Sequence, residues 1–151
     1  MAIRRLKQLS ESDKALVIEA LKALFHAHEE VIFALIYGSM VDPVIPGRYG
    51  DIDIAVYVRP EKLQVSEYII ESQIEAEAYR VLSNRVQDFP PVEVCIINNA
   101  PYSFLIPLFK GKYLVLKEDE EIMTDFIEEV SGKALANSYL RSESLREVVE
   151  G

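Results

Sequence analysis

The sequence contains one cysteine, Cys95, and no tryptophan among its 151 residues. A single cysteine cannot form an internal disulfide or supply a cysteine-based zinc site, and this scarcity favours a reducing compartment. No apolar run approaches the ~20 residues that a membrane helix needs, and no apolar segment follows the basic N-terminus as it does in a signal peptide. We therefore expect a cytoplasmic protein without a membrane span.

Positive charge is also scarce, because 16 Lys and Arg residues stand against 25 Asp and Glu residues, which gives a formal net charge of −9 at pH 7. A surface this acidic repels a phosphate backbone, which argues against general nucleic-acid binding but allows a local basic pocket around one nucleotide. Half of the residues (50%) are hydrophobic, enough for a sizeable core. The length predicts a single domain over residues 1–151.

The hydrophobic pattern predicts alternating helices and strands. A helix capped by Ser10 or Ser12 is expected to reach residue 25, a second one covers residues 61–86, and a helical tail begins at Glu118 with a break near Gly132. Strands are predicted at residues 31–37, 51–58, 92–97 and 113–116, with a loop at 40–50 and a short helix before the last strand. This order predicts an α/β or α+β fold in which helices cover one sheet.

Two acids, Asp51 and Asp53, lie two residues apart at the start of the predicted strand 51–58. Residues two apart in a strand point to the same face, so these carboxylates lie side by side, about 6.6 Å apart at Cα. Like charges at that distance repel each other unless a cation lies between them, and oxygen ligands suit magnesium. The alternative is a solvated strand face that happens to carry two acids.

The predicted strand 31–37 ends in Gly38-Ser39, and residues 40–50 separate this pair from Asp51. Backbone N–H groups and a hydroxyl without side-chain bulk can form a cradle for phosphate. Alternatively, Gly38 provides a turn with positive φ and Ser39 caps a helix. Together with the paired acids, however, the two residues form a more specific pattern.

This pattern resembles the DNA polymerase beta-like nucleotidyltransferase superfamily, whose signature is Gly-Ser or Gly-Gly, a loop, and then acid-hydrophobic-acid. It is most similar to the minimal nucleotidyltransferases of prokaryotes, which are often paired with a HEPN-family toxin. The resemblance implies a mixed β-sheet covered by α-helices. It also implies that Asp51, Asp53 and a third acid, Glu93, bind Mg²⁺ with ATP, while Gly38 and Ser39 hold the outer phosphates.

The chain departs from the family pattern at two positions. Family members commonly carry an arginine directly after Gly-Ser, and Met40 stands there instead. Binding of the triphosphate is then either weaker or taken over by Arg48, Lys110 or Lys112, and of these we assign Arg48 to the nucleotide site. The third acid is usually aspartate, whereas Glu93 is one methylene longer.

The resemblance implies transfer of AMP from ATP to a hydroxyl of a partner protein, which makes the chain the antitoxin of a HEPN-type toxin encoded nearby. A second hypothesis is a binding module that keeps this fold, has lost catalysis and neutralises its partner by contact. A third is transfer to a small molecule such as an aminoglycoside, which is disfavoured because no extra domain provides an acceptor pocket. A homo-oligomer is compatible with each hypothesis.

Overall fold

The computed structural model describes residues 6–140, with the side chains of residues 6–132. Within this part of the chain, no helix is both long enough and apolar enough to cross a membrane. The elements in chain order are β1 (Lys7–Gln8), α1 (Glu11–Ala27), β2 (Val31–Tyr37), the 3-10 helix η1 (Gly38–Met40), β3 (Arg48–Tyr49), β4 (Ile52–Val58), the 3-10 helix η2 (Pro60–Gln64), α2 (Glu67–Ser83), β5 (Val92–Ile96), α3 (Tyr102–Lys110), β6 (Tyr113–Lys117) and α4 (Glu120–Leu140).

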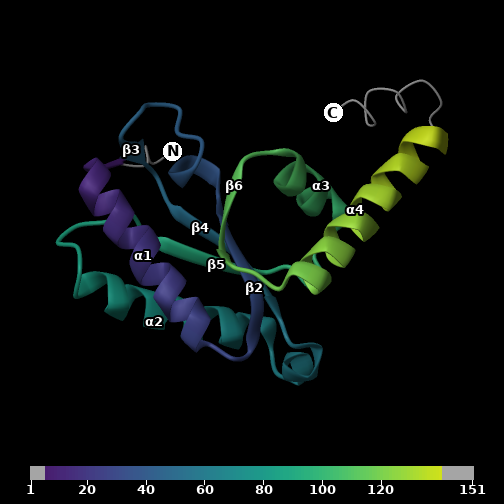
Figure 1. The fold of residues 1–151 in the computed structure, drawn as a ribbon, viewed down its shortest axis with the longest axis horizontal. Coiled ribbons are helices and arrows are strands. Elements are labelled where there is room, and N and C mark those ends of the chain that lie inside the picture. Colours follow the sequence, from purple (N-terminus) through teal and green to yellow (C-terminus); the bar gives the residue numbers. More distant parts are fainter. Residues whose placement is uncertain (1–5, 141–151) are drawn as a thin grey trace.

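A four-stranded sheet with the order β5-β4-β2-β6 forms the centre of the fold. Strand β2 runs antiparallel to both β4 and β6, whereas β4 and β5 are parallel. Helices α1 and α2 lie on one side of this sheet, and α3 and α4 lie on the other (Figure 1). The mixed sheet and its helical cover confirm the predicted fold class.

Alternation along β4 divides the core between the two faces of the sheet. Ile52, Ile54 and Val56 are fully buried and pack with residues of α1 and α2. Ala55 points the other way, and it is also fully buried, in the cluster that α3 and α4 cover. Because successive strand residues face opposite sides, each face has its own hydrophobic core.

Some predicted boundaries were wrong. Of the two proposed caps, Ser10 is the N-cap of α1, because its hydroxyl accepts a hydrogen bond from the Asp13 backbone N–H at 3.0 Å. The helix predicted over residues 61–86 is split, because Pro60 starts the 3-10 helix η2 and the extended Val65 separates it from α2.

Two further expectations needed correction. The predicted loop 40–50 contains β3, which pairs antiparallel with β1 in a separate two-stranded sheet. The expected break near Gly132 is absent from the described residues, since α4 runs without interruption from Glu120 to Leu140. One glycine costs a helix only about 1 kcal/mol, which does not end it.

The outer edge of β5 is covered by two glutamates of α2, which we call the edge clasp. The backbone N–H of Val94 donates to Glu75 Oε2 at 2.8 Å, and that of Ile96 donates to Glu71 Oε2 at 2.9 Å. Alternate N–H groups of an edge strand point away from the sheet, and residues four apart on a helix have a matching spacing. The clasp therefore satisfies donors that β4 cannot reach.

Removing the edge clasp is expected to destabilise the fold and expose a strand edge. Glu71→Ala with Glu75→Ala removes two charge-assisted hydrogen bonds, each worth about 1.5–3 kcal/mol. We expect a lower midpoint in urea unfolding and self-association in light scattering, because unpaired edges template pairing with other chains. Glu71→Gln with Glu75→Gln keeps an acceptor oxygen at each position and is the matched control. A double alanine variant with the same unfolding midpoint and the same light-scattering mass as the glutamine pair would contradict the role of the clasp.

Candidate functional site

The register of the sheet places Glu93, Asp53 and Tyr37 in one row across three neighbouring strands. Asp53 of β4 pairs with Glu93 of the parallel strand β5 on one side and with Tyr37 of the antiparallel strand β2 on the other. Directly paired residues point to the same face of a sheet. Two acids from sequence positions 40 residues apart therefore become neighbours beside an aromatic ring.

Asp51 is the residue before β4, and it lies close to Asp53 and Glu93. Ser39 holds the chain in place at this point. The Ser39 hydroxyl donates to the carbonyl oxygen of Asp51 at 3.3 Å and accepts from the Gly50 backbone N–H at 3.2 Å. These two bonds hold Gly50 and Asp51, at the end of the loop that follows η1, next to Ser39 within η1. Ser39 therefore has a positioning role for Asp51 that the sequence pattern did not reveal.

The three acids form a cluster suited to a metal ion. One carboxylate oxygen from each of Asp51, Asp53 and Glu93 lies within 4.8 Å of the others. Asp53 is partly buried and Glu93 is exposed, so the cluster lies at the surface of the fold. The donor set consists of oxygen atoms alone, which is the chemistry that Mg²⁺ prefers. The residues present therefore fit a magnesium site.

Gly38 packs its α-carbon directly against the carboxylate of Asp53. Its φ of +75° lies in the region that only glycine enters freely. A Cβ atom built at this position would lie 2.5 Å from Asp53 Oδ2. Gly38 is therefore required both by the backbone turn and by the space that the carboxylate occupies.

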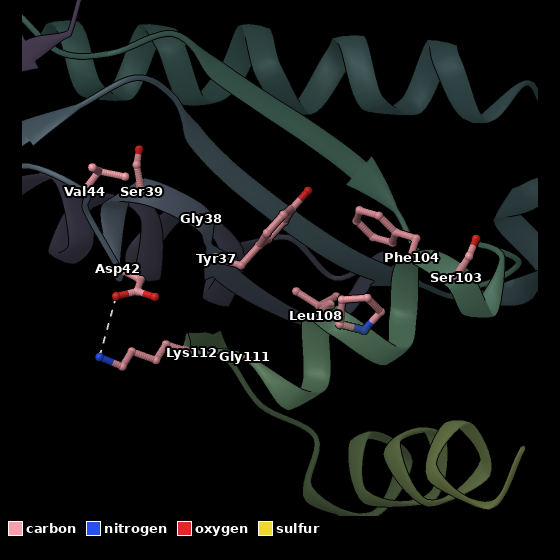
Figure 2. Close-up of a pocket in the computed structure, with 11 residues that line it drawn as sticks. Tyr37, Gly38, Ser39, Asp42, Val44, Ser103, Phe104, Leu108, Gly111 and Lys112 are labelled. Atoms are coloured by element: carbon pink, nitrogen blue, oxygen red, sulfur yellow. Dashed lines mark ion pairs between the residues drawn. The ribbon is translucent and has the colours of Figure 1, made fainter. Parts of the chain in front are cut away.

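A cavity of about 490 Å³ adjoins the acidic cluster, and its size is within the range of small-molecule sites. Figure 2 shows the Asp42–Lys112 pair at one end of this cavity, and Phe104 and Ser103 at the other. The lining comprises Tyr37, Gly38, Ser39, Asp42, Val44, Ser103, Phe104, Pro107, Leu108, Gly111 and Lys112. One end is therefore polar and charged, while the other is aromatic.

Of the three basic residues considered from the sequence, the structure brings only Lys112 to this cavity. Lys112 Nζ lies 3.6 Å from Asp42 Oδ1. Arg48 is exposed in β3, and neither it nor Lys110 is among the residues that line the cavity. Gly38 and Ser39 both line it, but the Ser39 hydroxyl already donates its hydrogen to the carbonyl oxygen of Asp51.

Tyr37 and Cys95 share the face of the acidic row, and both remain protonated at neutral pH. Burial raises the pKa of the Tyr37 phenol well above its usual value of 10.0, and the charges of Asp53, Cys95 and Glu93 raise it further. Burial also raises the pKa of the Cys95 thiol, with a smaller contribution from Glu71. Cys95 is therefore unsuited to act as a thiolate nucleophile.

The sequence pattern identified the acids but not the cavity. Tyr37, Asp42 and Phe104 are cavity residues that the motif did not include. Tyr37 directly precedes Gly38-Ser39, so its place at the end of β2 was the available signal. Phe104 reaches the cavity from α3, in contact with the Tyr37 ring at a centroid distance of 5.9 Å. No spacing rule in the sequence connects these two rings.

Solved structures of toxin–antitoxin proteins share this fold. A chain in the crystal structure of the toxin–antitoxin MntA-HepT is 13% identical, with a TM-score of 0.54 over 93% of this chain and 99% of that one. A chain in a crystal structure of a toxin–antitoxin with AMP-PNP is 15% identical, with a TM-score of 0.58 over 90% and 98% of the two chains. At these identities the likeness shows the fold alone. No curated protein matches the sequence.

The polymerase beta nucleotidyltransferase family matches residues 19–121, which is well over half of the chain. The matched range contains Gly38 and Ser39, the paired acids Asp51 and Asp53, and Glu93. The chain therefore belongs to the polymerase beta nucleotidyltransferase family, which confirms the family predicted from the Gly-Ser and acid-hydrophobic-acid pattern.

Proposed function

We propose that the chain is a magnesium-dependent nucleotidyltransferase that transfers AMP from ATP to a hydroxyl group of a partner protein. The observation that carries this proposal is the cluster of Asp51, Asp53 and Glu93, whose carboxylate oxygens lie within 4.8 Å of one another beside a cavity of nucleotide size. We place the whole domain, residues 1–151, and its activity in the cytoplasm.

The two ends of the cavity suit the two parts of ATP. Gly38 and Ser39 lie at the polar end, where the phosphates are expected, and Phe104 offers an aromatic surface for the base at the other end. A relative with this fold was crystallised with AMP-PNP, which supports an adenine nucleotide as the ligand. Magnesium held by the three carboxylates would stabilise charge on the attacking and leaving oxygens.

In the proposed reaction, an acceptor hydroxyl oxygen forms a bond to the α-phosphorus of ATP while the bond to the leaving pyrophosphate breaks. The hydroxyl proton passes to the Glu93 carboxylate, which is exposed and so accessible to an acceptor from outside. Asp51 and Asp53 would hold the magnesium that orients the reacting phosphate, since carboxylates alone would repel it. The Tyr37 phenol, with its raised pKa, stays protonated beside them and does not compete as a base.

We propose a HEPN-type toxin encoded nearby as the acceptor protein, so that this chain acts as its antitoxin. Two matched structures are toxin–antitoxin proteins by their own description, and their chains are covered almost completely, at 99% and 98%. This agreement of fold over nearly the full length supports the same type of pairing.

Incubation of the partner with this protein, ATP and Mg²⁺ is expected to increase the partner's intact mass by one or more AMP units. The increase should be absent when ATP is omitted or when EDTA removes the metal. Intact-mass spectrometry gives the number of groups added, and peptide mapping identifies the modified hydroxyl. A stable complex without any mass change would contradict transfer to the partner.

A binding module without catalysis is the second candidate, and Met40 favours it. Met40 follows Gly38-Ser39 at the position where the family commonly carries arginine, and it is only 1% exposed. Its side chain therefore contributes no charge to the cavity. In this case the complex forms with or without ATP, and neutralisation of the toxin does not depend on the nucleotide.

A further inference from the structure

We infer that Lys112 is the cation that binds the β- and γ-phosphates of the nucleotide, and that Asp42 holds it at the cavity until the nucleotide arrives. This inference deepens the proposed function and rests on it. The turn between α3 and β6 would then supply the phosphate-binding cation that Met40, the residue after Ser39, cannot supply.

The charges around the cavity favour a cation at its polar end. Of the described residues that line it, Lys112 is the one with a positively charged side chain. Asp42 contributes a negative charge to the lining, and the carboxylate of Asp53 lies directly against Gly38. A triphosphate carries more negative charge than one magnesium ion neutralises, so a lysine ammonium at the polar end would offset the remaining repulsion.

The turn that presents Lys112 is fixed by Gly111. The Gly111 backbone N–H donates to the Pro107 carbonyl oxygen at 2.9 Å and closes the end of α3. A Cβ atom on Gly111 would lie 3.1 Å from the same carbonyl oxygen. The chain can therefore turn sharply between α3 and β6. Lys112, the next residue, lies at the cavity (Figure 2).

The contact between Lys112 and Asp42 is suited to exchange. Their charged atoms are 3.6 Å apart, and the two side chains are 74% and 65% exposed. An exposed ion pair of this kind contributes little to stability, so a phosphate oxygen can replace Asp42 at small cost. The pair keeps the lysine near the cavity without closing the site to the ligand.

Titration of each variant with ATP, and separately with AMP, in the presence of Mg²⁺ and without the partner tests this inference. Lys112→Met is expected to weaken ATP binding about tenfold or more, as loss of one charge-assisted contact does, and to leave AMP binding unchanged. Asp42→Asn is expected to tighten ATP binding about twofold to fivefold, because it removes a negative charge from the lining. Lys110→Met, two residues earlier and outside the lining, is the matched control.

The outcomes separate this inference from the proposed function. Equal ATP affinity of wild type and Lys112→Met would overturn the role of Lys112 while leaving a nucleotide-binding protein. An equal loss of ATP and AMP binding in Lys112→Met would also overturn it, since the β- and γ-phosphates would then not be what the lysine contacts. If wild type binds neither nucleotide, both the inference and the proposed function fail.

Discussion

Replacing Gly38 by alanine is expected to reduce nucleotidyl transfer by about 100-fold or more, at a stability cost of only about 1 kcal/mol. The new methyl group would meet Asp53 Oδ2 at 2.5 Å, and the carboxylate is the mobile end of its side chain. It can therefore rotate away cheaply, but it then leaves the position it shares with Asp51 and Glu93. Displacement of a ligand by about 1 Å is enough for such a loss of rate.

Gly47 provides a matched control for this prediction. Its φ of +80° is close to the +75° of Gly38, so alanine suffers similar backbone strain at both positions. A Cβ atom on Gly47 meets nothing within 4 Å. Gly47→Ala should therefore lose about the same free energy of unfolding while it retains activity. Equal activity of the two variants would show that the contact with Asp53 is not required.

The double substitution Asp51→Asn with Asp53→Asn is expected to lower transfer by about 1,000-fold or more. Metal stabilisation of the reacting phosphate is worth several kcal/mol, and each 1.36 kcal/mol changes a rate tenfold. The amides keep the size of the side chains but remove two negative charges from the three-carboxylate cluster. Quantitative intact-mass analysis of the partner over time measures the rate.

Thermal unfolding gives a second readout that does not depend on transfer. A ligand that binds only the folded state raises its Tm, so Mg²⁺ should raise the Tm of wild type and leave that of the double variant unchanged. Asp88→Asn removes an exposed carboxylate that pairs with Lys7 and lies outside the cluster. Mg²⁺ should raise the Tm of this variant by as much as that of wild type. Equal Mg²⁺ effects on the wild-type Tm and on that of the double variant would contradict the metal site.

The sequence predicted the sheet better than it predicted the loops. The run from Val31 to Tyr37 is short, apolar and rich in β-branched and aromatic residues, and it forms β2 as expected. Alternation placed Asp51 and Asp53 on one face and Glu93 opposite its apolar neighbours, and the structure brings all three together. Period-two patterns have a fixed geometry, which explains this success.

The cavity could not be predicted in the same way, because its wall comes from segments without a shared pattern. Phe104 and Lys112 reach it from opposite ends of α3, and Asp42 follows η1. Which lysine enters the cavity depends on the sharp turn at Gly111, a feature of packing rather than of composition. From the sequence we therefore assigned Arg48 to the nucleotide site, whereas Lys112 is the residue among the three that lines the cavity.

The edge clasp also limits how another protein can recognise this chain. A partner that adds a strand to an open sheet edge forms mainly backbone hydrogen bonds. Because all proteins share the same backbone, such binding discriminates poorly among sequences. Glu71 and Glu75 already accept from the outward N–H groups of Val94 and Ile96, so these two donors are not available to an added strand. We therefore expect a partner that binds next to Glu93 to contact side chains more than backbone, and side-chain contacts discriminate between partners.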